Sequence, residues 1–426
     1  MMTQEKRLTE QQGKLFQDEL EDEENLNDRE NSPGSTIIFS TVKPEMLLWG
    51  RQYAYLSISD ASQRIGVPVE KLREWENGVS SPTVVQLHKI ARIYKQLFAV
   101  FYMPIPPKPA SLPLKDFRRL PSTGISEISY ELAGEIRTAI NRREIAVRMV
   151  EEMEEEPIEF SLTANIHEKP SEIAEKVRSL LFSDLSKIPS FTNKYNAFRF
   201  FRERLERLGI LVFQSSSVSV SEMRGFSVYE SQFPVIVVNR KDSPAGRIFS
   251  LFHELTHILL RTAGVCEIDP DITLPPEKQE IEVFCNKVSA EILMPYQLFL
   301  EHAQHKLSTN GDTFFSDLVI LQLSNEFGVS REAVVRRLLT IGLVSKEFYQ
   351  SKRDQFLQEI PDQTKQKKSE SRPISPAKTI VSLAGKTYIN LVLNAMGQDR
   401  ITLNDASGFL NLRIKQISVV GHLVGM

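Results

Sequence analysis

The sequence predicts a multidomain α+β protein, with a small mixed sheet set between helical segments. The chain has 426 residues, which is enough for two to four domains that each bury a core. Short runs of β-branched and aromatic residues fall within residues 210–239. Apolar residues at helical spacing dominate the chain on both sides of this region, as in residues 192–208 and 318–344. Strands confined to one part of a mostly helical chain are typical of the α+β class.

The most informative stretch carries the pattern His-Glu-x-x-His at His253, Glu254 and His257. On a helix, side chains four residues apart lie on one face, so the two imidazoles can bind one metal ion. Glu254 then lies beside the pair, where it can take a proton from a water molecule on the metal. Ser243 and Pro244 suit a helix cap and a first helical residue, so we expect the helix to begin there.

A third ligand for the same metal is expected on a second, largely buried helix that ends at Pro295. Glu282 is the expected ligand, because a carboxylate completes a site of three protein ligands and leaves the fourth position for water. Asn286 follows one turn later on the same face and can hold a ligand histidine from outside the coordination sphere. The alternative is a solvated helix start for these two residues and ordinary core packing for the histidines.

Four segments follow one another in the chain: Arg224-Gly225-Phe226-Ser227, then residues 234–239, residues 247–257 and residues 282–295. Together they resemble the ImmA/IrrE family of metallo-endopeptidases, over about residues 195–300. The sequence departs from the usual pattern at Thr256, Val288 and Ser289, none of which is an expected ligand. The best understood family members cut repressors of the helix-turn-helix type. The resemblance therefore implies a zincin-like domain and a repressor as substrate.

The chemistry expected of this site is metal-assisted hydrolysis of a peptide bond. Zinc held by the two histidines and Glu282 lowers the pKa of a bound water to about 7 and polarises the scissile carbonyl. Glu254 accepts the proton and passes it to the leaving nitrogen. The ligand set alone also permits manganese or iron. Three residues are alternatives for stabilising the developing oxyanion: Tyr296, His302 and Arg247.

Composition limits the other roles of the chain. The net charge is only −3, so any contact with DNA must come from a local basic patch. Two cysteines, Cys266 and Cys285, form no disulfide framework and fit a reducing cytoplasm. Cys285 lies between Glu282 and Asn286, and we expect it to pack in the core rather than bind the metal. The sequence has neither a run of 18 apolar residues nor an apolar signal segment, so we expect a soluble cytoplasmic protein without a membrane partner.

Residues 59–65 and 69–78 are predicted to form two short helices across a turn that contains Gly66. With the apolar helix that follows, they resemble the Xre-type helix-turn-helix domain of phage and plasmid repressors. Lys71 and Arg73 are the expected DNA contacts. Three glutamates on the same helix disfavour phosphate binding, so protein docking is the alternative: Glu70, Glu74 and Glu76.

The remaining segments are assigned mainly by composition. One of the β-type runs is expected to be an edge strand beside the metal helix that holds an extended substrate, although a strand that only packs beneath the helix is the alternative. Residues 318–344 predict a second helix-turn-helix-like unit, made basic by Arg331, Arg336 and Arg337, for which packing against the protease is favoured over DNA reading.

These segments give the expected domain boundaries. They are a disordered acidic arm at 1–36, an Xre-type helix-turn-helix at 37–104, a Pro-rich connector and helical bridge at 105–194, a zinc metallopeptidase at 195–305, a helix-turn-helix-like helical unit at 306–350, a linker at 351–376 and a small helical C-terminal segment at 377–426.

The expected function is a zinc-dependent endopeptidase that cleaves a helix-turn-helix transcriptional repressor and so switches gene expression. The alternative is a DNA-binding transcriptional regulator or antitoxin-like protein whose zinc fold is not catalytic. Glu254 favours the peptidase, because a structural metal site needs no base beside the metal. Cleavage of the chain's own repressor-like domain is also conceivable.

Overall fold

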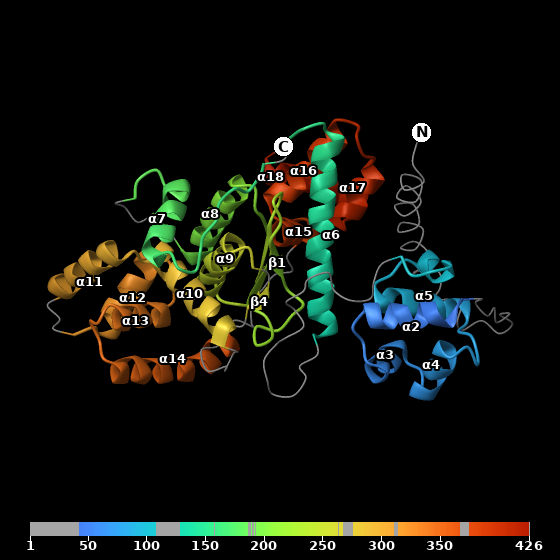
Figure 1. The fold of residues 1–426 in the computed structure, drawn as a ribbon, viewed down its shortest axis with the longest axis horizontal. Helices are drawn as coiled ribbons and strands as arrows, with labels where there is room; N and C mark the ends of the chain where they lie inside the picture. The colour runs from blue at the N-terminus through green and yellow to red at the C-terminus, as the bar shows by residue number, and fades with distance from the viewer. Residues whose placement is uncertain are drawn as a thin grey trace. The chain divides into compact units, whose positions relative to one another are not determined.

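The computed structural model describes residues 42–107, 128–156, 158–185, 189, 191, 193–262, 264–266, 276–310, 314–366 and 375–425 (Figure 1). Their contacts divide the chain into two compact units. The first holds the described residues of Met1–Leu120, Gly124–Arg142 and Val392–Ser418, and the second those of Arg143–Leu391 and Val419–Met426. The expected acidic arm at 1–36 lies outside the described residues. Among the described helices, none is long and apolar enough to cross a membrane.

The first unit is helical. Helix α3 (Ile58–Ile65) ends at Gly66, whose φ of 78° suits glycine, and α4 (Val69–Glu76) begins directly after Pro68, so both short helices expected there are present. The neighbouring elements are α2 (Pro44–Tyr53), α5 (Val84–Tyr94) and the 3-10 helix η1 (Phe98–Tyr102). The core of this unit contains large side chains from α2, α4, α5 and η1: Trp49, Leu72, Trp75, Leu87 and Phe101.

The second unit is built on a four-stranded mixed sheet with the order β1-β3-β2-β4. The three β-type runs of the sequence form β1 (Leu211–Ser215), β2 (Gly225–Val228) and β3 (Val235–Asn239), which confirms three strands in that region. β1 pairs with β3 in parallel, and β2 pairs antiparallel with both β3 and β4 (Gly264–Cys266). Every residue of β1, β2 and β3 is buried, as expected for strands covered on both faces.

Helices cover this sheet and bring the expected metal-binding segments together (Figure 1). α9 (Pro244–Leu259) packs against β2 and β3, and α8 (Lys194–Arg207) and α10 (Pro276–Leu293) pack against α9. α7 (Pro170–Leu181) packs against α10. The shared core joins Phe201, Phe252 and Val288, so α9 lies between the sheet and α10 with most of its length buried.

The edge strand next to the metal helix differs from the expectation. It is β4, which follows α9 directly, and not one of the three longer runs. β2 and β3 are interior strands. β1 forms the opposite edge, and α15 (Pro376–Ala384) packs against it. A three-residue strand has too little sequence pattern to be detected and depends on its pairing with β2.

Helices α11 (Tyr296–Asn310), α12 (Asp317–Glu326), α13 (Arg331–Thr340) and α14 (Lys346–Gln366) follow α10. Residues 351–366, expected to belong to a linker, therefore lie in a helix. α14 packs along α13, and the arginines of α13 are bound by carboxylates of the same unit. Arg337 is buried and lies 2.8 Å from Glu291, and Arg331 pairs with Glu359. These contacts favour structural packing over DNA reading for this helix pair.

The long helix α6 (Tyr130–Glu152) precedes α7. In the C-terminal segment, where the sequence predicts small helices, α15 is followed by α16 (Lys386–Gly397), α17 (Leu403–Leu410) and α18 (Ile414–Val424). Residues 382–388 belong to the second unit and bind α8 and β1 of that unit. The carbonyl oxygen of Ser382 accepts hydrogen bonds from Arg202 of α8 (2.7 Å) and Gln214 of β1 (2.7 Å). Thr387 donates to Glu206 at 3.1 Å.

Candidate metal centre

The helix that carries the His-Glu-x-x-His pattern starts where the sequence predicts. Ser243 caps α9 by accepting a hydrogen bond from the Gly246 amide, and Pro244 is the first helical residue. His253, Glu254 and His257 are all buried, with exposed fractions of 0%, 0% and 4%. Burial of three polar side chains on one helix is costly unless they bind one another or a ligand.

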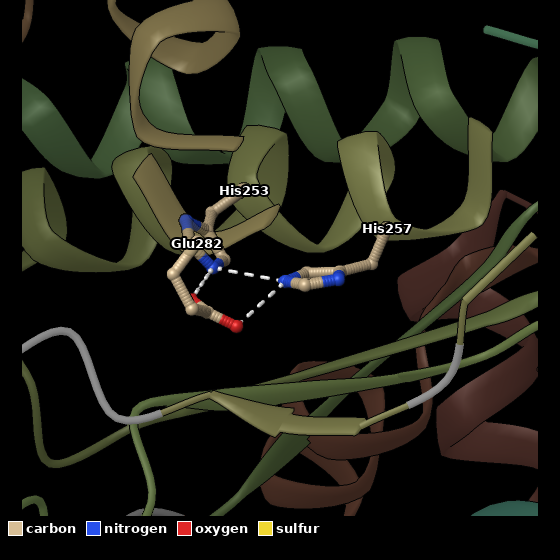
Figure 2. Close-up of side chains that lie close together, drawn as sticks. All are labelled: His253, His257 and Glu282. Atoms are coloured by element: carbon tan, nitrogen blue, oxygen red, sulfur yellow. Dashed lines mark hydrogen bonds and ion pairs between the residues drawn. The ribbon is translucent and has the colours of Figure 1, made fainter. Parts of the chain in front are cut away.

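Glu282 reaches the two histidines from α10, as Figure 2 shows. One carboxylate oxygen lies 3.0 Å from Nε2 of His253, and the other lies 3.3 Å from Nε2 of His257. The two Nε2 atoms are 3.2 Å apart. The side chains of all three expected ligands therefore lie close together. The Glu282 side chain is 21% exposed, whereas the two histidines are almost fully buried.

The donor set and its spacing fit a tetrahedral metal ion. Ligand atoms about 2.1 Å from a common zinc ion would be about 3.4 Å apart. The two Nε2 atoms are 3.2 Å apart, and each lies at 3.0 or 3.3 Å from a different oxygen of the Glu282 carboxylate. Two imidazole nitrogens and one carboxylate also match the ligands of catalytic zinc sites, which leave a fourth position open. Among the described residues, this is the one group of three or more such side chains in reach of a single ion.

The remaining nitrogen of each imidazole has its own partner. Nδ1 of His253 lies 3.1 Å from Oδ1 of Asn286, the contact expected from the sequence. Nδ1 of His257 lies 3.1 Å from the hydroxyl of Thr262, a residue that the sequence interpretation missed. The feature of the sequence that could have pointed to Thr262 is its position five residues after His257, just beyond the end of α9. Such outer partners fix the orientation of metal-binding imidazoles.

Electrostatics within the cluster follow from burial and close pairing. Burial alone would raise the pKa of Glu282, but its hydrogen bonds with His253 and His257 lower that pKa well below the usual range. Burial opposes a charge on His253, yet the hydrogen bond and charge of Glu282 raise the pKa of that imidazole. The Glu282 carboxylate and the His253 imidazole therefore stabilise each other's charged forms.

Glu254, the base expected from the sequence, lies beside the ligand histidines on α9. It is completely buried, and no described group makes a well-oriented hydrogen bond to either carboxylate oxygen. Burial raises the pKa of Glu254, against the effect of the His257 and His253 imidazoles and of the nearby Ser227 hydroxyl. Gly225 of β2 packs against this carboxylate. A buried carboxylate without a partner, beside two imidazoles, is suited to accept a proton from a bound water.

Two of the three residues considered for oxyanion stabilisation have other partners. Arg247 is buried, donates to Gln214 at 2.7 Å and lies over the ring of Phe198. His302 lies 2.9 Å from Glu326. The third residue, Tyr296, is half exposed at the start of α11. None of the three belongs to the ligand cluster, and no other residue is assigned this role.

Cys285 does not join the ligand cluster. Its thiol is fully buried on α10, and burial raises its pKa far above the ordinary value, assisted by the charges of Glu282 and Glu254. Lys71 and Arg73, the expected DNA contacts, belong to the first unit and are exposed on α4. Lys71 forms an ion pair of 2.8 Å with Glu74.

The family match supports a metallopeptidase-type domain around this cluster. Residues 205–339 match the family model Peptidase_M78, described as the IrrE N-terminal-like domain, and this match supports the ImmA/IrrE family for that part of the chain. The matched segment begins within α8 and ends within α13, and it contains the complete ligand cluster. A search of curated proteins found no match.

Proposed function

We propose that the chain is a zinc-dependent endopeptidase. The convergence of His253, His257 and Glu282 next to the buried base Glu254 carries this proposal. Zinc, when bound there, would lower the pKa of a water molecule to about 7 and polarise the scissile carbonyl. Neutral imidazoles suit a borderline-soft ion, and the carboxylate ligand offsets part of its charge.

The side chains of the site have separate tasks in this reaction. Glu254 accepts a proton at its carboxylate and returns it to the nitrogen of the leaving peptide. Its burial excludes bulk water and raises its pKa, which favours proton uptake. Asn286 orients His253 from outside the coordination sphere.

Edge strand β4 offers a place for an extended substrate. It pairs with β2 on one side, and no described strand pairs with its other side. A peptide added there would form main-chain hydrogen bonds as a fifth strand. The substrate class that we propose is a helix-turn-helix repressor, in keeping with the family that residues 205–339 resemble, and its cleavage would switch gene expression in the cytoplasm.

Metal analysis combined with cleavage assays tests the proposal. The wild-type chain should bind about one zinc per molecule and cut a repressor substrate. Glu254→Gln should keep the zinc and lose at least about a hundredfold in kcat, whereas Glu282→Ala should lose the zinc. Glu280→Gln is the matched control, because Glu280 is exposed on the same helix and should behave as wild type. Zinc binding without Glu254-dependent cleavage would rule out the peptidase in favour of a non-catalytic zinc fold.

DNA binding by the first unit is a second candidate, in which α3 and α4 form an Xre-type helix-turn-helix. The observation that favours it is that one carboxylate of α4 is turned away from the surface. Glu76 makes two hydrogen bonds with Arg51 of α2, at 2.7 and 2.9 Å, and its side chain is 6% exposed, whereas Glu74 stays exposed and pairs with Lys71. Fluorescence anisotropy with duplex DNA would test it, and affinity that falls with salt and with Lys71→Ala and Arg73→Ala is expected. Equal, salt-independent signals for all variants would leave protein docking as the role of this unit.

A further inference from the structure

The hydroxyl group of Thr262 contacts the imidazole of His257, the second histidine of the site. We propose that Thr262 holds His257 in the tautomer whose Nε2 lone pair is free to bind the metal, by means of the turn that ends α9. This proposal rests on the proposed function, because it assumes that Nε2 of His257 is a metal ligand.

The turn itself has a defined hydrogen-bond pattern. Arg261 adopts a left-handed conformation with a φ of 55°, and its amide donates to the carbonyl oxygen of Ile258 at 3.0 Å. The Thr262 amide donates to the carbonyl oxygen of His257 at 2.9 Å. These two bonds form the Schellman motif, which reverses the chain over the last helical turn. The motif therefore returns the side chain of Thr262 to His257.

The protons of this contact can be assigned from its acceptors. The Thr262 hydroxyl lies 3.2 Å from the carbonyl oxygen of His257 and 3.1 Å from Nδ1 of the same residue. A carbonyl oxygen can only accept, so both contacts are hydrogen bonds only when the single hydroxyl proton is donated to the carbonyl oxygen. The hydroxyl oxygen is then left to accept a hydrogen bond, and Nδ1 must be the donor. A proton on Nδ1 leaves the lone pair of a neutral imidazole on Nε2, which faces Glu282.

The two histidines are thus held in different ways. His253 is held by Asn286 of another helix, through an amide oxygen that can only accept, so Nδ1 of His253 is the donor in that contact. His257 is held by a residue of its own helix end, through a hydroxyl whose proton is already committed to the backbone. His257 and the group that orients it therefore lie on α9 and on the turn that directly follows α9. Thr262 is the positioning residue for His257.

Zinc affinity tests this inference independently of cleavage. We would measure it by competition with a chelator for the full-length chain and for Thr262→Val, which has nearly the same shape but lacks the hydroxyl. Loss of an outer hydrogen bond to a metal-binding histidine weakens metal binding about 10-fold to 100-fold, and we expect this loss for Thr262→Val. Thr262→Ser keeps the hydroxyl and should bind zinc within about threefold of wild type.

Thr256→Val is the matched control. The Thr256 hydroxyl is also buried on α9 and donates to a backbone carbonyl oxygen, that of Phe252 at 2.8 Å, but no metal ligand is its partner in that bond. It should keep the zinc affinity of the wild type. Equal affinities for Thr262→Val and Thr256→Val would overturn the inference, as would a loss in Thr262→Ser as large as that in Thr262→Val.

A measurement on the wild type covers the case in which Thr262→Val does not fold. In the zinc-loaded chain, proton NMR with labelled histidine should show the Nδ1 proton of His257 protected from exchange with water. Rapid exchange of that proton would overturn the inference. A chain that binds zinc tightly but cuts no protein would refute the proposed peptidase and leave the role of Thr262 intact, whereas a chain that binds no zinc would refute both.

Discussion

Gly225 lies directly against the carboxylate of Glu254. A Cβ atom added to Gly225 would lie 3.0 Å from Oε1 and 3.1 Å from Cγ of Glu254, and 3.1 Å from the carbonyl oxygen of Val237. These distances are shorter than ordinary van der Waals contacts, so the glycine sets how closely β2 approaches α9. The position of the Glu254 carboxylate therefore depends on the absence of a Cβ atom at Gly225 in β2.

Replacement of Gly225 should impair catalysis without removing the metal. In Gly225→Ala the new methyl group would push Glu254 away by a few tenths of an ångström, and we expect kcat to fall about 10-fold to 100-fold. Zinc content should stay at the wild-type value, because Glu254 is not a ligand. Gly408→Ala is the control, since a Cβ there would meet nothing within 4 Å. A Gly225→Ala enzyme with wild-type kcat would contradict this role.

Arg337 should be important for stability and Arg336 should not. The Arg337 side chain is 4% exposed and lies 2.8 Å from Glu291 of α10, so Arg337→Ala would leave a carboxylate without its buried partner. We expect a loss of about 3 kcal/mol in the free energy of unfolding of the second unit. Arg336 is exposed and pairs with Glu332 at 3.4 Å, so Arg336→Ala should cost about 0.5 kcal/mol or less. Urea denaturation of both variants measures the difference, and similar losses would show that α13 is not anchored through Arg337.

Cys285 should resist alkylation in the native chain. Its burial raises its pKa, so the reactive thiolate is scarce at neutral pH and stays scarce as the pH rises through the usual range of thiol ionisation. Peptide mapping after iodoacetamide treatment at several pH values should show no increase in labelling at Cys285 between about pH 7 and 9. The same treatment in denaturant should label it fully. Native labelling that rises steeply across this interval would mean that the thiol is accessible.

Gly385 should matter for the packing of residues 382–388 against α8 within the second unit. It has a φ of 79°, and an added Cβ would collide with the Glu206 carboxylate and lie 2.5 Å from Nη2 of Arg202. Gly342→Ala is the matched control, because Gly342 has a similar φ of 77° with nothing within 4 Å. Both variants carry backbone strain, but Gly385→Ala should lose about 2 kcal/mol more stability because of its overpacking. Equal losses, measured by urea denaturation, would show that this contact is loose.

The sequence predicts which side chains gather around His253 and His257, because the geometry of this group is local. Two histidines four residues apart on a capped helix must share a face, and Glu282 and Asn286 share a face for the same reason. The three longer strands are equally visible, because each is a run of residues that favour strands.

Features that depend on tertiary structure could not be predicted in this way. Thr262 reaches His257 only because Arg261 takes a left-handed conformation that usually favours glycine. Helix α14 has a polar sequence typical of a linker, and its order depends on partners in α12 and α13, such as the 2.8 Å ion pair between Lys352 and Asp317. β4 forms through its pairing with β2, across a separation of about forty residues that no local pattern reveals.

The packing of α15 against β1 affects the order in which the protein can be assembled. β1 is an edge strand that pairs on one side with β3, and the residues that cover it, 376–388, lie beyond the matched family segment, which ends at residue 339. During synthesis, the ribosome would release the strands well before it releases their cover, at a rate of about 5 to 20 residues per second. For several seconds the nascent sheet would then expose an apolar edge that other chains could bind. A fragment cut to the family boundaries would keep that edge exposed permanently and would also lose α7 and most of α8, so its aggregation would not by itself show that the metal centre is unstable.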